Sequence, residues 1–358
     1  MDRILCGKGK TMSPYLEFLK RKVCVAPDSG FSIDPEDLSP ALKPHQRAAV
    51  AWALKGGRRA LFESFGLGKT VQQLEWCRQV VRHEGGRALI VLPLGVRQEF
   101  RRDAVELLGM EAPAYVRTMA EVEAAAEGIL LTNYERVRDG DIDPKCFTAV
   151  SLDEASVLRS FGSKTYQTFL DKFQGVRYKL VNTATPSPNK YKELIHYAGY
   201  LEVMDTGQAL TRFFQRDSTK ANNLTLYPHK EDEFWLWVSS WALVLTRPSD
   251  LGFEDEGYAL PPLEVRRHVV REEYGHACDR DGQMKLMNDA AVSLSDAARE
   301  KRESIGLRVA KAKEIVESDP DAHFLLWHDL EAERHAIKEA FPEAVDIYGA
   351  MDYDERER

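Results

Sequence analysis

The feature that most constrains the fold is a regular alternation of apolar runs with amphipathic stretches in the first half of the chain. Each apolar run is short and continuous, as is typical of a parallel strand buried on both faces. Between two pairs of runs, residues 70–81 and 96–109 place apolar side chains on one side of a helix. Strands that alternate with helices predict an α/β fold with a parallel sheet and crossover connections. The expected strands cover residues 58–65, 87–94, 128–133, 147–154 and 178–185.

A glycine-rich stretch, FESFGLGKT, follows the first expected strand and leads into a helix. Ligands of parallel sheets bind beyond the carboxyl ends of the strands, and a helix N-terminus attracts anions. Gly66 and Gly68 would let a phosphate group approach the backbone closely. Lys69 is able to reach the β- and γ-phosphates of a nucleotide, and the Thr70 hydroxyl is able to bind Mg²⁺. The stretch therefore predicts a phosphate-binding loop.

One position departs from the generic loop, because Glu63 stands where the pattern G-x-x-x-x-G-K-[ST] begins with glycine. An ordinary helix-start turn with a solvated lysine is therefore the alternative. The stretch VSLDEAS, residues 150–156, favours the nucleotide site. It ends an apolar strand with Asp153, a candidate Mg²⁺ ligand, and Glu154, a candidate base for the attacking water.

Composition limits the classes of function. The chain has 358 residues, enough for two domains, and a formal net charge of −8, so no global basic field attracts nucleic acid. Its five cysteines have no metal-ligand spacing, which favours free thiols in a reducing cytoplasm. The start of the chain lacks the apolar core of a signal peptide. Residues 234–245 are too few to cross a membrane and predict a buried helix.

Taken in order, these motifs resemble those of the superfamily-two helicases, and within them the Swi/Snf-like DNA translocases. LKPHQRAAVAWAL, residues 42–54, is similar to the segment whose glutamine reads adenine, which here is Gln46. FESFGLGKT resembles the family's D-E-M-G-L-G-K-T, in which an acid occupies the position of Glu63. LDEAS resembles the D-E-A-H (DEAD/DEAH) box, with Ser156 in place of the histidine.

The resemblance also implies contacts with the nucleic-acid backbone. ALIVLPL (88–94) and ILLTNYERVR (129–138) resemble the two motifs that make such contacts. LVNTATPSPN resembles L-T-G-T-P-x-Q-N, so Thr183 and Thr185 would couple the ATP site to the nucleic-acid site. For the arginines a solvated surface position is the alternative. The candidate backbone contacts are Pro93, Arg97, Arg101, Thr132 and Tyr134.

The domain organisation follows from the same resemblance. Residues 244–265 resemble the link that leaves the first motor lobe. Residues 323–341 resemble the first strand and helix of the second lobe, and residues 346–358 resemble its next strand and turn. Two segments outside the motifs are expected to pack inward, at Trp235, Trp237 and Trp241 and along the helix 284–318 with Leu307, Val309, Ile315 and Val316. The expected domains are an N-terminal extension (1–40), a first RecA-like lobe (41–200), a helical insertion or linker (201–262) and a partial second RecA-like lobe (263–358).

In the resembled family, the second lobe continues with two further motifs, and the last carries arginine fingers worth about 10³–10⁵ in rate. Arg356 and Arg358 lie in a solvated charge run and are not expected to replace them. We therefore expect a truncated chain that binds ATP but hydrolyses it inefficiently alone. The short sequences DEAS, TATPSPN and PSDLG most resemble the corresponding motifs of helicases carried by phages and prophages.

The expected function is hydrolysis of ATP to ADP and phosphate, stimulated by double-stranded DNA and coupled to translocation. Lys69 and Thr70 would hold phosphate and Mg²⁺, Asp153 would hold Mg²⁺, and Glu154 would act as general base. Phage, restriction or repair proteins are the expected partners. One alternative is an ATP-binding P-loop switch or accessory subunit without motor activity, and another is an RNA helicase.

Overall fold

The computed structural model describes residues 25–160, 162–216, 224–270 and 301–356. The chain divides into two compact units, one reaching to Leu260 and the other beginning at Pro261. The first unit contains the sheet and the glycine-rich loop.

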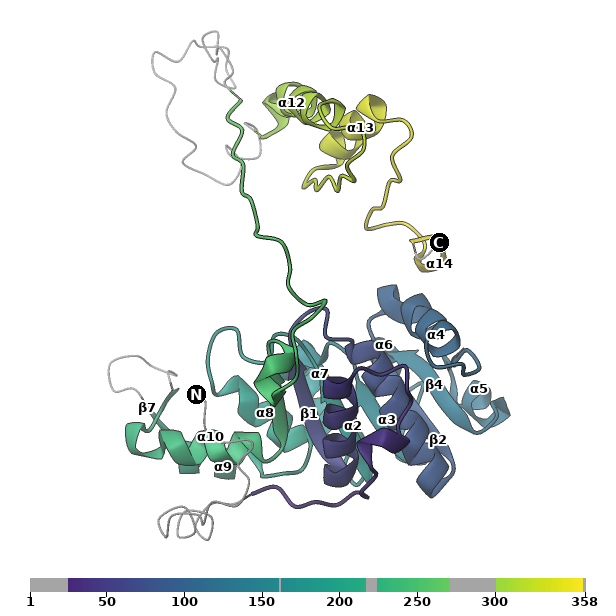
Figure 1. The fold of residues 1–358 in the computed structure, drawn as a ribbon, viewed down its shortest axis with the longest axis vertical. Helices are drawn as coiled ribbons and strands as arrows, with labels where there is room; N and C mark the ends of the chain where they lie inside the picture. Colours follow the sequence, from purple (N-terminus) through teal and green to yellow (C-terminus); the bar gives the residue numbers. More distant parts are fainter. Residues whose placement is uncertain (1–24, 161, 217–223, 271–300, 357–358) are drawn as a thin grey trace. The chain divides into compact units, whose positions relative to one another are not determined.

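The first unit is built on a seven-stranded sheet with the order β3-β4-β2-β5-β6-β1-β9. Strands β1, β2 and β4 of this sheet are labelled in Figure 1. Every neighbouring pair of strands runs parallel, which confirms the α/β fold class and its parallel sheet. All five of the expected apolar runs form strands, and the short β3 was not predicted. The strands are β1 Arg58–Glu63, β2 Arg87–Leu92, β3 Ala114–Tyr115, β4 Gly128–Asn133, β5 Ala149–Leu152, β6 Tyr178–Asn182 and β9 Ala242–Leu245.

Helices cover both faces of the sheet, so each strand is buried on two sides. Successive residues of β2 alternate between the two cores: Leu89 and Val91 enter one, and Ala88 and Ile90 enter the other. This explains why the strands read as continuous apolar runs. On one face lie α2 Pro44–Gly56, α3 Lys69–Glu84 and α4 Arg97–Glu106; on the other lie α5 Met119–Ala124, α6 Tyr134–Asp139, α7 Lys164–Lys172, α8 Glu193–Tyr200, α9 Thr206–Phe213 and α10 Glu231–Ser239.

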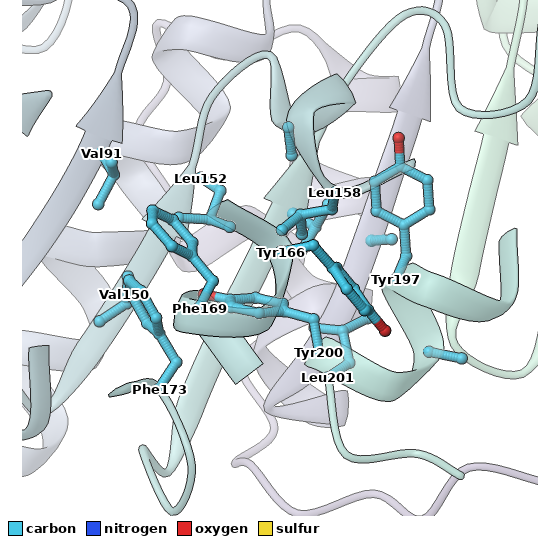
Figure 2. Packing of buried hydrophobic residues seen from close by; sticks show 14 of the residues in the cluster. Val91, Val150, Leu152, Leu158, Tyr166, Phe169, Phe173, Tyr197, Tyr200 and Leu201 are labelled. Carbon is cyan, nitrogen blue, oxygen red and sulfur yellow. The ribbon is translucent and has the colours of Figure 1, made fainter. Parts of the chain in front are cut away.

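The core that contains Leu89 and Val91, on the face covered by α5 to α10, is rich in aromatic side chains, as Figure 2 shows. Phe169 of α7 packs against Phe173, with ring centroids 4.8 Å apart, and Phe173 packs edge-on against Tyr200 of α8. The ring of Tyr134, which belongs to α6, stacks on the ring of Phe169. These contacts pack α6, α7 and α8 together, and the Tyr134 hydroxyl also reaches the carbonyl of Asp153, which follows β5.

The apolar run 234–245 divides into a helix and a strand, so the prediction of one buried helix was wrong for its second half. Helix α10 ends at Ser239, and β9 then pairs with β1 at the edge of the sheet. The burial of the tryptophans is confirmed, because Trp237 and Trp241 are 1% and 0% exposed and Trp235 is partly buried. None of the helices in the described part of the chain is both long and apolar enough to span a membrane. A short antiparallel pair, β7 Phe214–Arg216 and β8 Leu224–Leu226, lies between α9 and α10.

The second unit contains α12 Ile305–Glu317, α13 Glu331–Ala340 and α14 Tyr353–Arg356. Helices α12 and α13 pack together, and an ion pair joins Arg308 to Glu333. Val309 is buried as expected, but Leu307 is 41% exposed, so its predicted inward position was wrong. The part of the predicted helix before residue 301 lies outside the described residues.

The strands expected at the start of segments 323–341 and 346–358 are not formed. Leu325 and Trp327 are 75% and 85% exposed, and Val345 is 87% exposed. A strand is stabilised by pairing with a neighbour, and the described residues of this unit provide no such neighbour. The apolar pattern of a strand is present there without the sheet that would bury it.

Candidate nucleotide-binding site

The glycine-rich loop joins the end of β1, at Glu63, to the start of α3, at Lys69. Gly66 and Gly68 both have positive φ, +79° and +82°, a region that favours glycine. A Cβ atom at position 68 would also lie 2.3 Å from Nε2 of Gln46. Glycine is therefore required at position 68 by backbone conformation and by space together.

Gln46 lies in α2, and its side chain packs directly against this loop. Its Nε2 donates a hydrogen bond of 2.8 Å to the carbonyl of Leu67. Its Oε1 accepts one of 2.8 Å from the backbone N–H of Lys43, which fixes the orientation of the amide. The structure thus brings the predicted adenine reader to the phosphate loop, while its role toward adenine stays a prediction.

Lys69 and Thr70 begin helix α3 at the carboxyl end of the sheet. The Lys69 ammonium group donates hydrogen bonds of 3.1 Å to the carbonyls of Glu63 and Ser64, so it folds back over the loop. Within the described residues the Thr70 hydroxyl makes no hydrogen bond. The positive charge and a hydroxyl are therefore placed together at the N-terminus of a long helix, where anions are stabilised.

Glu63 lies beneath the loop, where its side chain is fully buried. Nε2 of Gln72 donates a 2.7 Å hydrogen bond to its Oε2, while Oε1 has no partner among the described residues. Burial raises the pKa of this carboxyl to about 7, although the Gln72 hydrogen bond and the charge of Lys69 act in the opposite direction. The acid that replaces the first glycine of the generic loop is thus an interior group.

The acidic pair follows β5, two strands away from β1 in the sheet order. Asp153 is 7% exposed, and its Oδ1 accepts a 2.7 Å hydrogen bond from Nε2 of Gln73 in α3. Burial raises the pKa of Asp153 to about 6, against the opposing effect of that hydrogen bond. Glu154 has the left-handed conformation, with φ of 46°, which is uncommon for a non-glycine residue. Strain of this kind often occurs at functional sites.

The two predicted coupling threonines differ in exposure. Thr183 is buried after β6, and its hydroxyl donates a 3.3 Å hydrogen bond to Oε2 of Glu154. Thr185 is exposed, and its backbone N–H donates to the Thr183 hydroxyl at 3.2 Å. The predicted base and the predicted coupling motif are therefore in direct contact.

The donor set suits Mg²⁺ held jointly with phosphate oxygens. Mg²⁺ commonly takes one or two protein ligands together with water and substrate phosphates. The described residues contain no group of three or more histidine, cysteine or acidic side chains that could hold a metal ion without such help. Thr70 and Asp153 offer a hydroxyl and a carboxylate at the carboxyl end of the sheet, which fits this mode of binding.

Two of the predicted nucleic-acid contacts lie in the interior. Thr132 is fully buried in β4, and its hydroxyl donates to the carbonyl of Val116 at 2.8 Å. Tyr134 is 8% exposed, and its hydroxyl donates a 2.6 Å hydrogen bond to the carbonyl of Asp153. Both hydroxyls are engaged with backbone carbonyls, and only that of Tyr134 supports the acidic pair.

The other predicted contacts follow β2. Pro93 is partly buried and precedes the short 3-10 helix η2 Leu94–Val96. The Arg97 guanidinium carbon lies 5.0 Å from the centroid of the Tyr115 ring, and this arginine is 8% exposed. Arg101 lies one turn further along α4 and is partly buried. Arg97 is thus the less accessible of the two arginines, and Arg101 is the better placed to meet a phosphate.

Four functional candidates were missed from the sequence, all of them buried and polar. They form hydrogen bonds to the acids of the site or to each other. Ser151 and Asn182 interrupt apolar runs, which was the available signal, whereas Gln72 and Gln73 lie in an amphipathic helix. They are Gln72, Gln73, Ser151 and Asn182.

The parallel sheet, with this loop after β1 and this acidic pair after β5, is a RecA-like lobe. No known protein family and no curated protein matches the sequence. Among solved structures, the chain is similar to the SWI2/SNF2 ATPase core of Sulfolobus solfataricus in complex with dsDNA, with 17% identity and a TM-score of 0.46 over 60% of this chain and 47% of that one. It is also similar to the UvsW helicase from bacteriophage T4, with 15% identity and a TM-score of 0.38 over 52% of this chain and 64% of that one.

A third similar structure is the Hef helicase domain of Pyrococcus furiosus, with 16% identity and a TM-score of 0.37 over 44% of this chain and 36% of that one. The matched part is less than two thirds of each of these three chains.

Proposed function

We propose that this chain is a DNA-stimulated ATPase of the Swi/Snf-like helicase type, with its ATP site in the first RecA-like lobe. One observation carries the proposal: helix α3 links the phosphate loop to the acidic pair. It begins with Lys69 at the loop, and one turn later Gln73 donates its 2.7 Å hydrogen bond to Asp153. The two halves of an ATPase site are thereby joined through one rigid element.

In this proposal each residue has a role toward the nucleotide. The loop N–H groups and Lys69 bind the phosphates, Gln46 reads the adenine edge, and Thr70 and Asp153 hold Mg²⁺. The bound metal would neutralise charge on the phosphate oxygens as the bond to the leaving group breaks. Lys69 exchanges its hydrogen bonds to two backbone carbonyls for bonds to phosphate oxygens, so little structural change is needed for binding.

Hydrolysis requires a water molecule to attack the γ-phosphorus. Glu154 accepts a proton from this water, the new bond forms between the water oxygen and phosphorus, and ADP leaves with the electrons of the broken bond. The Thr183 hydroxyl, at 3.3 Å from Oε2 of Glu154, orients that carboxylate. Because Thr183 lies in the segment that resembles a coupling motif, DNA binding would act on hydrolysis through this contact.

DNA is the proposed nucleic acid because the motifs resemble those of Swi/Snf-like DNA translocases, and duplex DNA is the proposed form. The contacts would be made by the segment after β2, with the partly buried Arg101 as a candidate cation. Since the chain carries a net charge of −8, binding must rely on such local cations and should weaken steeply as salt rises. Arg101 would contribute affinity and not base choice.

The test compares ATP binding and ATP hydrolysis with and without duplex DNA. Lys69→Ala should abolish ATP binding, and Glu154→Gln should keep binding but lower hydrolysis by about 10²-fold or more. Lys164→Ala is the matched control, because Lys164 also begins a helix but is exposed and distant in sequence from the loop. Unchanged ATP binding in Lys69→Ala would overturn the site.

The competing functions give different results in the same assays. ATP binding without DNA-stimulated hydrolysis would favour an ATP-binding switch. Stronger stimulation by RNA than by duplex DNA, with RNA displacing DNA, would favour an RNA helicase.

A further inference from the structure

A line of buried hydrogen bonds crosses from β6 to the acidic pair. Nδ2 of Asn182 donates to Oγ of Ser151 at 3.0 Å. Oγ of Ser151 donates to Oε1 of Gln73 at 2.8 Å. Nε2 of Gln73 then donates to Oδ1 of Asp153 at 2.7 Å. Asn182, Ser151 and Gln73 are fully buried, so no water competes for these bonds.

The direction of these bonds is determined by their chemistry. An amide nitrogen can only donate, so the Ser151 oxygen accepts from Asn182 and has one proton left to give. That proton goes to Oε1 of Gln73, which leaves Nε2 facing Asp153. In the reversed orientation, Nε2 of Gln73 would face the hydroxyl hydrogen of Ser151, and Oε1 would face the carboxylate of Asp153. Two donors would then oppose each other at one end of the amide and two acceptors at the other. Ser151 therefore selects the orientation of Gln73.

The consequence for Asp153 is that its two ends are held separately. Gln73 binds Oδ1 of the side chain, and the Tyr134 hydroxyl binds the backbone carbonyl at 2.6 Å. In the described part of the chain Oδ2 has no hydrogen-bond partner. The carboxylate is thus fixed with one oxygen engaged and the other available.

We propose that Gln73, oriented by Ser151 and Asn182, is a positioning residue that presents Oδ2 of Asp153 to the Mg²⁺ of an Mg²⁺–ATP complex. This inference rests on the proposed function, since it concerns the same ATP site. Partners that orient a metal ligand typically contribute 10–100-fold to metal affinity or activity. Gln73 touches neither nucleotide nor metal in this proposal, so its removal should alter the dependence on Mg²⁺ while nucleotide binding without metal is preserved.

The same helix provides a matched control. Nε2 of Gln79 donates a 2.7 Å hydrogen bond to Oε1 of Glu75, and both side chains are buried. This is also a glutamine–carboxylate bond in α3, but it lies on the turns of the helix that follow Gln73. A purely structural role for Gln73 would predict similar effects for Gln73→Met and Gln79→Met.

The experiment measures binding of a fluorescent ATP analogue, first in EDTA and then over a range of Mg²⁺ concentrations. For Gln73→Met we expect unchanged binding in EDTA and an Mg²⁺ concentration for half-maximal enhancement that rises by about tenfold or more. Ser151→Ala should raise it by a smaller factor, because the amide loses the group that orients it. Gln79→Met should leave it within about twofold of the unsubstituted chain. Circular dichroism and urea unfolding establish that each variant is folded.

The outcomes separate the inference from the function on which it rests. If the unsubstituted chain binds no ATP at any Mg²⁺ concentration, the proposed function and this inference both fail. If it binds ATP with an Mg²⁺ dependence that folded Gln73→Met and Ser151→Ala leave unchanged, the inference alone fails. The inference also fails if Gln79→Met shifts the Mg²⁺ dependence as far as Gln73→Met does.

Discussion

Gln72 donates a 2.7 Å hydrogen bond from Nε2 to Oε2 of Glu63, a carboxyl that is fully buried at the end of β1. The next residue, Gln73, makes the corresponding bond to Asp153 after β5. Two consecutive glutamines of α3 thus serve two buried acids on different strands. The first turn of α3 therefore fixes the loop and the acidic pair with respect to each other.

The Glu63 carboxyl should make stability depend on pH. Its folded-state pKa is about 7, raised by burial from the ordinary value of 4.5. A raised pKa means that the folded state holds the proton more tightly than the unfolded state. The contribution of Glu63 to stability is thus fully present below pH 4.5 and is lost as pH rises through 7. Glu63→Gln should remove this loss, which is at most on the order of 3 kcal/mol.

Reversible urea unfolding at several pH values between 4.5 and 7.5 would measure this effect as the difference between the unsubstituted chain and Glu63→Gln. The variant has a side chain of nearly the same size, and its amide oxygen can still accept the hydrogen bond from Gln72. The expected result is a difference that grows in favour of the variant as pH rises. Two curves that remain parallel over the whole range would contradict the assigned pKa direction.

A methyl group should be tolerated very differently at the two glycines of the loop. Gly68→Ala combines a φ of +82° with a Cβ 2.3 Å from Nε2 of Gln46, so the Gln46 amide must shift and its hydrogen bond to the Leu67 carbonyl is disturbed. Gly66→Ala has a similar φ of +79° but meets nothing within 4 Å. We expect Gly68→Ala to weaken ATP binding by more than about tenfold and Gly66→Ala by clearly less, since backbone strain alone costs about 1–2 kcal/mol. Equal losses of ATP affinity in the two variants would show that the Gln46 contact is unimportant.

The central fold could be predicted because its strands are buried on both faces and therefore leave a direct pattern. Apolar runs identified β1, β2, β4, β5 and β6, and the turn residues after them identified the loop and the acidic pair. The strand β9 was missed because 234–245 is apolar throughout, and such a run looks alike in a buried helix and a buried strand. Ser239 and Ser240, where α10 gives way to β9, were the available break.

The supporting residues of the site could not be predicted in the same way. Gln73 and Asn182 are 109 positions apart and meet through Ser151 only once the sheet order is known. Exposure is likewise a property of the tertiary fold: Tyr134 sits in a segment that resembles a DNA-contact motif, yet its ring stacks on Phe169 in the core. In the second unit the start of segment 323–341 has a strand pattern, but the described residues of that unit offer it no neighbouring strand.

Truncating a buried tryptophan should destabilise the first unit strongly. Trp241 is fully buried and packs edge-on against Phe62 of β1 and Trp237 of α10. Trp241→Ala should lower the free energy of unfolding by about 3–5 kcal/mol, through lost burial and the cavity left behind. Trp235→Ala, at a partly buried position, should cost less. Urea unfolding followed by circular dichroism would compare the two, and an equal or smaller cost for Trp241→Ala would contradict its central place in the core.

Tyr134 and Arg101 should separate structural support from DNA contact. Tyr134→Phe keeps the ring on Phe169 but removes the hydroxyl that binds the Asp153 carbonyl, so it should lower the free energy of unfolding by about 1–3 kcal/mol. It should leave duplex DNA affinity unchanged within about twofold, because the side chain is buried. Arg101→Ala should instead weaken binding to all duplex sequences and reduce the salt slope of log K by about 1. DNA titrations at several salt concentrations would measure both, and a loss of DNA affinity confined to Tyr134→Phe would reverse the two assignments.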